Sequence, residues 1–254
     1  MGGGEADFKR KQRRGFFFKK EERHTMTGYK FTRNAYCNCE KQIYNGVGPF
    51  DIPKILPQEI DLEDPEILGF NYAKGEDFPE EKICHFYLDD YQFERVWKDP
   101  DLYVDLMKSF KAVLAPDFSL YTDFPRAVQI YNHYRKHWIA RYWQDHGVKV
   151  IPTICWSDEE SFQWCFDGEP RNATVSISVL GCNRDEQMKR DYWIGFNKAI
   201  EVLTPKRILL FKGNSPVELP DCGGAEIIEV RSGNLAGAKA YKNGVNVSRE
   251  TKIK

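Results

Sequence analysis

Several features that define other classes of protein are missing from this sequence of 254 residues. No uninterrupted apolar run approaches the roughly 18 residues that a membrane-spanning helix needs, so no membrane association is expected. The N-terminal segment lacks the charged-then-apolar layout of a secretory signal, and the expected location is cytoplasmic. The glycines form neither a P-loop nor a dinucleotide-binding motif, so ATP and NAD are unsupported as cofactors.

Paired cysteines and metal-binding motifs are also missing. The seven cysteines, an odd and scattered number, do not form a disulfide framework. Cys37 and Cys39 have no second pair nearby, which falls short of the usual zinc spacing. His133 and His137 lie four residues apart in an expected helix, but no Glu or third His accompanies them in a His-Glu-x-x-His arrangement. Surface or helix-packing roles are therefore expected for both histidines, and no metal site is predicted.

Charge is unevenly distributed along the chain, although the net charge is only −1. Residues 1–41 carry 11 Lys or Arg against 5 Asp or Glu, and residues 231–254 carry 6 against 1, which leaves 20 against 32 in residues 42–230. Basic arms suit a phosphate backbone, because each neutralised phosphate releases counterions. The arms therefore predict DNA or RNA as a partner; the alternative is that solvated termini serve solubility.

Apolar, strand-like runs alternate with helical patterns, which predicts a mostly parallel α/β fold. Expected strands begin near residues 67, 83, 111, 148, 173, 207 and 225, and expected helices cover 91–110, 125–144, 158–166 and 185–203. The first of these helices is expected to be broken or kinked near Pro100. This order favours a distorted or incomplete (β/α) barrel, with an open doubly wound sheet as the alternative. The expected divisions are a basic arm (1–28), an irregular lead-in (29–66), the α/β domain (67–231) and a basic tail (232–254).

Polar side chains gather where the expected strands end, and binding groups in parallel α/β folds lie at that edge. The catalytic candidates are Asp89, Asp90 and Asp117, since paired carboxylates can divide acid and base roles or hold a divalent cation. Asp117 is the first choice as base or nucleophile, and its structural alternative is an Asx-turn. The substrate-binding candidates are Tyr121, Trp156, Asp158, Ser178, Lys212 and Arg231. Tyr121 and Trp156 offer aromatic faces for a nucleobase or a sugar, with core burial as the alternative for Trp156.

The most distinctive segments are Ala115-Pro-Asp-Phe-Ser-Leu-Tyr-Thr-Asp-Phe-Pro125, Gln129-Ile-Tyr-Asn-His-Tyr-Arg135, Val150-Ile-Pro-Thr-Ile-Cys-Trp-Ser157 and Phe162-Gln-Trp-Cys-Phe-Asp-Gly168. Over roughly residues 45–215 the sequence resembles an uncharacterised family found mainly in bacteria, phages and mobile elements. That family is named only as a domain of unknown function, so the resemblance implies no catalytic residues. A phage or mobile-element setting favours a nucleic-acid role by association only.

These features lead to one main hypothesis and two alternatives. The main hypothesis is a phage or mobile-element enzyme that acts on a nucleotide, nucleic acid or related glycoside through the carboxylates around Asp117. The first alternative is a non-catalytic nucleic-acid-binding accessory protein whose basic arms bind. The second is an inhibitor of a host system, in which the acidic body faces a basic host protein. A structure bears on the choice, because carboxylates that share a reaction must lie within reach of one another.

Overall fold

The computed structural model describes residues 37–63, 65–180, 186–212 and 221–230, together with the backbone of residues 240–242 and 245–247. The chain divides into two compact units, Met1–Ile43 and Tyr44–Lys254, and the second contains the described helices and strands. The predicted basic arm and Arg231 lie outside the described residues. No helix in the described part of the chain is long and apolar enough to cross a membrane.

Short parallel strands form the centre of the second unit. They are β1 (Glu66–Gly69), β2 (Lys82–His85), β3 (Ala112–Leu114), β4 (Val150–Ile151), β5 (Thr174–Ser178), β6 (Arg207–Phe211) and β7 (Glu226–Val230). β1 to β4 pair in sequence order, as do β5 to β7, and an isolated parallel bridge between Thr153 and Ser176 joins the two sets. At this junction Ser176 N donates to Pro152 O at 2.8 Å, and Ile154 N donates to Ser176 O at 2.9 Å. Neighbours along the chain are therefore neighbours in space, as in a (β/α) barrel, whereas a doubly wound sheet reverses its strand order.

The sheet curls, because side chains from strands that are not neighbours meet on its inner face. The ring centroids of His85, at the end of β2, and Phe211, at the end of β6, are 4.9 Å apart. Tyr87, just beyond β2, lies 4.7 Å from the same Phe211 ring. One buried cluster combines residues of the lead-in and of strands from both ends of the sheet: Ile60, Leu62, Ile67, Ile83, Ala112, Leu114, Ile151, Leu209, Phe211 and Val230. Among the described residues β1 and β7 are not paired, so the predicted parallel α/β fold is confirmed as an unclosed, distorted barrel.

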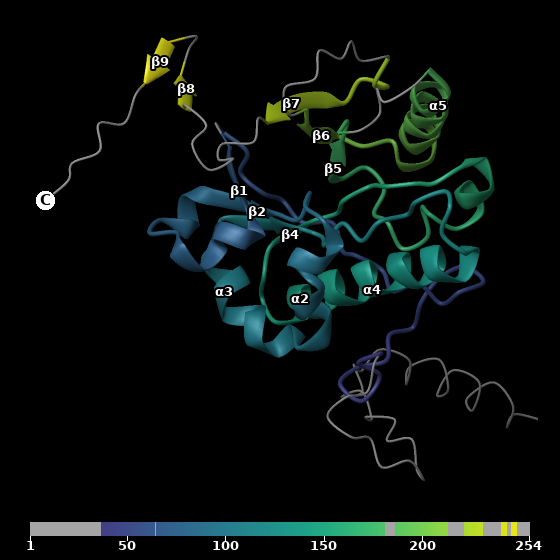
Figure 1. Ribbon diagram of the computed structural model, residues 1–254, viewed down its shortest axis with the longest axis horizontal. Coiled ribbons are helices and arrows are strands. Elements are labelled where there is room, and N and C mark those ends of the chain that lie inside the picture. The colour runs from purple at the N-terminus through teal and green to yellow at the C-terminus, as the bar shows by residue number, and fades with distance from the viewer. Residues whose placement is uncertain are drawn as a thin grey trace, which may run out of the picture. The chain divides into compact units, whose positions relative to one another are not determined.

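Helices cover the outside of this sheet (Figure 1). The α-helices are α2 (Glu94–Lys98), α3 (Val104–Ser109), α4 (Arg126–Asp145) and α5 (Glu186–Leu203). The 3-10 helices are η1 (Phe70–Gly75), η2 (Pro79–Glu81), η3 (Asp90–Gln92), η4 (Pro100–Tyr103) and η5 (Glu159–Gln163). Figure 1 shows α2, α3 and α4 beside β1–β4, and α5 beside β5–β7. A further strand pair, β8 (Ala240–Lys242) and β9 (Val245–Val247), is antiparallel.

The helix expected over 91–110 is broken near Pro100, as predicted, because Pro100 lacks an amide hydrogen and disfavours helical backbone at the residue before it. The segment forms η3, α2, η4 and α3, with the break at Pro100 between α2 and η4. Asp99 accordingly has φ −145° and ψ 76°. The first strand ends at Gly69, where the chain turns into η1.

Candidate functional site

Asp117 lies where the chain leaves β3, and the residue is partly exposed. Thr153 Oγ1 donates to Ala115 O at 2.8 Å, which holds the chain just before this residue. Burial raises the pKa of Asp117 to about 6; the charge of Lys136 and a hydrogen bond from Cys155 lower it, and the Asp90 carboxylate raises it. A carboxyl group with such a pKa can both take up and release a proton near neutral pH.

A continuous set of polar contacts leads from Asp117 into the interior. Cys155 hydrogen-bonds to the Asp117 carboxylate, and Lys136 Nζ lies 3.7 Å from Cys155 Sγ. Lys136 Nζ also donates to Glu169 Oε1 at 2.7 Å, and this oxygen lies 2.9 Å from His137 Nε2. Lys136, His137 and Glu169 are buried, whereas Asp117 and Cys155 are partly exposed.

The charges in this set compensate one another. Burial acts to lower the pKa of Lys136, but the carboxylates of Glu169 and Asp117 hold it above its ordinary value. Burial raises the pKa of the Cys155 thiol, so Cys155 serves as a neutral hydrogen-bond donor and not as a thiolate nucleophile. Lys136 Nζ makes a further hydrogen bond to Thr153 O at 2.8 Å. The ammonium group is thus fully engaged beneath the ends of β3 and β4.

The inner face of α4 positions these groups, because it is polar where a core helix is usually apolar. Its buried polar residues are Gln129, Asn132, His133, Arg135, Lys136 and His137. Gln129 Nε2 donates to Tyr121 O at 3.0 Å and to Phe124 O at 2.9 Å. Asn132 Nδ2 donates to Ser119 O at 2.7 Å. These bonds fix the loop after β3 and therefore the position of Asp117.

Glu169 reaches α4 from a loop that requires glycine. Gly168 has φ +77°, and a Cβ there would lie 2.5 Å from Pro53 O and 2.7 Å from His137 Nδ1. Ile55 N donates to Gly168 O at 2.9 Å, which ties this loop to the lead-in segment. The close approach allows Pro53, His137 and Glu169 to meet.

Two hydroxyl groups lie on the same side of the sheet as Asp117. The Tyr87 hydroxyl is 2.8 Å from Ser176 Oγ, which donates to Leu209 O at 3.0 Å. Because the Ser176 hydrogen is used in this way, Tyr87 is the donor to Ser176. Burial, and then the nearby Asp117 carboxylate, raise the pKa of Tyr87 well above its ordinary value.

The other two catalytic candidates differ in their surroundings. Asp90 accepts hydrogen bonds from Ser119 N at 3.2 Å and from Ser119 Oγ at 2.8 Å, and it lies 3.9 Å from the Arg135 guanidinium. It therefore holds the loop, and its charge acts on the pKa of Asp117. Asp89 is exposed at the start of η3.

Three of the substrate-binding candidates make internal contacts. Asp158 accepts from Ser161 N at 3.0 Å, which caps η5, and lies 2.9 Å from the Arg126 guanidinium. Ser178 Oγ accepts from Leu180 N at 3.2 Å. Lys212 lies 3.3 Å from the Glu229 carboxylate. These contacts give each side chain a structural role.

The aromatic candidates lie on different surfaces. Tyr121 is 54% exposed and packs edge-on against Phe124. Trp156 is half-buried, with its ring 5.2 Å from that of Tyr192 on α5. A Cβ at Gly195 would lie only 2.1 Å from Trp156 Nε1, so the indole rests directly on α5. Arg231, the last candidate, lies outside the described residues.

Sequence reasoning did not find the inner part of the site. Lys136, Glu169, Tyr87, Ser176 and Cys155 are not among the site residues that the sequence predicts. The signal that was available is the row of polar residues on the buried face of α4. Buried polar side chains need partners, so this row indicates further polar groups on the segments that face the helix.

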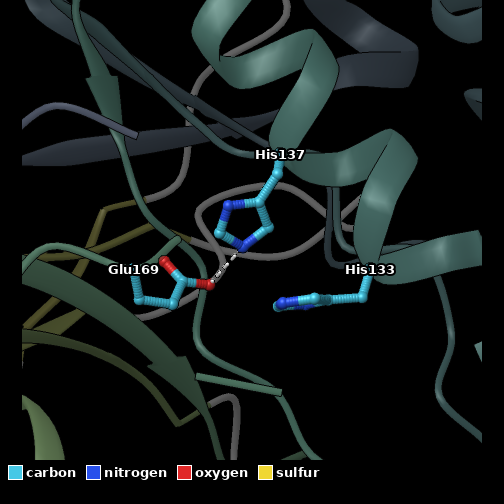
Figure 2. Close-up of side chains that lie close together, drawn as sticks. All are labelled: His133, His137 and Glu169. Carbon is cyan, nitrogen blue, oxygen red and sulfur yellow. Dashed lines mark hydrogen bonds and ion pairs between the residues drawn. The ribbon is translucent and has the colours of Figure 1, made fainter. Parts of the chain in front are cut away.

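One group of side chains has atoms suited to a metal ion. His133, His137 and Glu169 are buried, and each offers a ligand atom within 4.8 Å of the others. Figure 2 shows the two imidazole rings extending from α4 towards the carboxylate of the facing loop. The histidine spacing was noted in the sequence, but Glu169 is 32 residues from His137 and no spacing rule relates them.

Residues 44–230 match the family described as Domain of unknown function (DUF4417). The chain belongs to this family. Gene 1 protein of Mycobacterium phage L5 is 33% identical over 193 residues, which are 75% of this chain and 81% of that protein. Gene 1 protein of Mycobacterium phage D29 is 39% identical over 127 residues, which are 50% of this chain and 47% of that protein. No solved structure matches the chain. The resemblance to an uncharacterised family with phage members is thus confirmed, and the DUF4417 region includes Asp117 and every group that contacts it.

Proposed function

We propose that this protein is an enzyme acting on a nucleotide or glycoside, with Asp117 as its general acid and base. The observation that supports this role is the carboxyl group of a partly exposed residue at the C-terminal edge of parallel strands, with its pKa raised to about 6. Binding and catalytic groups of parallel α/β folds lie at this edge. A general acid or base works best when its pKa is close to the working pH.

The surrounding groups favour a small, hydroxyl-rich substrate over a long polyanion. Residues 42–230 carry 20 basic against 32 acidic side chains, and Asp90 lies close enough to raise the pKa of Asp117. This negative field opposes a phosphate backbone at the site. Carboxylate oxygens accept hydrogen bonds from the ring hydroxyls that nucleosides and glycosides share. The sugar portion is therefore the part of the substrate that we assign to Asp117.

A substrate panel tests the proposal. Wild-type protein is incubated, with and without divalent cations, with nucleosides, nucleotides and aryl glycosides, and products are followed by mass spectrometry. Turnover of one class is expected, with a loss of roughly a hundredfold or more in Asp117→Asn, as for removal of a general acid or base. The matched control is Asp123→Asn, the same change at an exposed position of the same loop. Turnover that survives in Asp117→Asn, or no turnover of any class, contradicts the proposal.

The charge distribution favours a second candidate, a nucleic-acid-binding accessory protein. Residues 1–41 carry 11 basic against 5 acidic side chains, and residues 231–254 carry 6 against 1. Asp158 pairs with Arg126, and Lys212 pairs with Glu229. These ion pairs support a structural role for that part of the strand edge. In this case binding resides in the arms and depends on salt.

A further inference from the structure

His133 and His137 each have one ring nitrogen committed to a backbone carbonyl. His137 Nδ1 lies 2.9 Å from Pro53 O, and His133 Nε2 lies 3.1 Å from Asp167 O. A carbonyl oxygen can only accept, so both of these nitrogens carry hydrogen. In a neutral imidazole the remaining nitrogen then has a free lone pair. These nitrogens are His137 Nε2 and His133 Nδ1.

The two lone pairs face the buried carboxylate of Glu169. His137 Nε2 lies 2.9 Å from Glu169 Oε1, so two acceptors are in contact unless a cation lies between them. His133 Nδ1 and Glu169 Oε2 are buried and have no hydrogen-bond partner among the described residues. Buried polar atoms without partners are rare in folded proteins and require an explanation.

We propose that His133 Nδ1, His137 Nε2 and the Glu169 carboxylate bind one divalent transition-metal ion of the zinc class. Each of the three residues offers one ligand atom within 4.8 Å of those of the other two, which is close enough for one ion to bind all three residues. Two histidines and one glutamate form a known type of zinc ligand set, which leaves a fourth position open. A metal-bound histidine almost always donates its other N–H to a carbonyl or carboxylate, as both histidines do here.

A proton alone explains less of this arrangement. An imidazolium at His137 would bond to Glu169, but His133 Nδ1 would still have no partner. A metal ion uses both lone pairs, and Oε2 of the carboxylate remains available to it while Lys136 occupies Oε1.

The three ligands come from two separate parts of the fold. His133 and His137 belong to α4, and Glu169 belongs to the loop that contains Gly168. The backbone oxygen of Gly168 accepts a hydrogen bond from Ile55 N. Binding therefore fixes α4 to this loop and to the segment around Pro53. This inference does not depend on catalysis at Asp117, and the Asp117→Asn variant is expected to keep the metal.

Metal content and metal-dependent stability test the proposal. The full chain, purified without chelator, is analysed by mass spectrometry for elements, with about one equivalent of metal per chain expected. After chelator treatment, added Zn²⁺ should raise the melting temperature in a concentration-dependent way, because the ion binds the folded state. Added Co²⁺ should give the intense visible absorption of a low-symmetry, four-coordinate site.

Two variants identify the ligands. His133→Ala removes a side chain whose Nδ1 has no protein partner, and it should lose both the metal and the Zn²⁺-induced stabilisation. His146→Ala, at an exposed position just after α4, is the matched control and should retain both. Circular dichroism of each variant shows that it is folded. Two results would overturn the proposal: wild-type protein that gains neither stability nor absorption from Zn²⁺ or Co²⁺, or a folded His133→Ala variant that binds them as wild type does.

Discussion

The carboxyl group of Asp117 holds its proton more tightly in the folded chain than in the unfolded one. Its pKa is raised from 3.8 to about 6, with burial as the largest cause. A group with a raised folded-state pKa contributes stability that is present at low pH and is lost as the pH rises through the folded pKa. Ionisation of Asp117 therefore destabilises the fold between about pH 4 and pH 6.

Replacing Asp117 with Asn should remove this pH dependence. Asparagine keeps the shape of aspartate and cannot ionise. The stability of the variant relative to wild type should therefore increase as the pH rises from about 4 to about 7. The expected gain is about 2–3 kcal/mol, since the pKa shift is about two units and one unit corresponds to about 1.4 kcal/mol. Urea denaturation across this range measures it. If the two proteins differ in free energy of unfolding by the same amount at every pH, burial does not shift the pKa of this carboxyl group.

Lys136 and Glu169 form a buried pair whose separation should be costly. Their side chains are 1% and 0% exposed, and Nζ lies 2.7 Å from Oε1. Lys136→Met leaves the carboxylate without its ammonium partner, and a loss of about 3–5 kcal/mol in the free energy of unfolding is expected.

The control for this change is Lys198→Met. Lys198 pairs with Glu201 at 2.9 Å, but the two side chains are 37% and 69% exposed. A change of at most about 0.5 kcal/mol is expected there. Similar losses at the two positions, measured by urea denaturation, would contradict the account of a tightly coupled interior pair.

At the scale of elements, the sequence predicts where helices and strands lie better than it predicts which distant residues contact each other. Strand and helix positions follow from local apolar periodicity, and α4 and β6 appear close to where the pattern places them. The pairing of Lys136 with Glu169 joins residues 33 apart, and the tight turn at Gly168 makes it possible. Local periodicity carries no information on such a contact, so the sequence analysis names Asp117 as a candidate but not the groups behind it.

The packing of Trp156 on α5 can be tested at Gly195. A Cβ at Gly195 would lie 2.1 Å from Trp156 Nε1, so Gly195→Ala must displace the indole. Overpacking of this kind typically costs about 1–3 kcal/mol, which outweighs the gain of up to about 1 kcal/mol in helix propensity. A lower melting temperature and altered tryptophan fluorescence are expected.

Gly75→Ala is the comparison for this substitution. A Cβ at Gly75 meets nothing within 4 Å, so the melting temperature should remain close to that of wild type. If Gly195→Ala is as stable as wild type, the indole is free to move away from α5. A stacking role for Trp156 would then regain support.

At the scale of the whole molecule, curling of the sheet and uneven charge are the defining features. The parallel order was predictable from strand-helix alternation, whereas the degree of closure was not. Closure depends on contacts such as Tyr87 with Phe211, which join distant strands. The site lies within residues 42–230, which carry 20 basic against 32 acidic residues, whereas the basic excess lies in residues 1–41 and 231–254.

Removal of residues 1–28 tests the arms. If they bind DNA or RNA, truncation should weaken binding and flatten the dependence of log K on log salt, by about 0.9 per lost contact with a duplex phosphate. Changing only the basic residues of the segment 9–14 to Gln separates charge from chain length. Equal salt slopes for the truncated and full-length proteins, measured by fluorescence anisotropy, would rule out this role.

The most direct test of the account is the titration of Asp117 itself. Carbon-detected NMR of protein labelled at aspartate carboxyl groups can follow this residue, and its signal is the one that disappears in Asp117→Asn. The account expects a midpoint at about pH 6, because burial disfavours the charged form. A midpoint at or below the ordinary aspartate value of about 4 would contradict it, since Asp117 would then be fully ionised and unable to act as an acid near neutral pH.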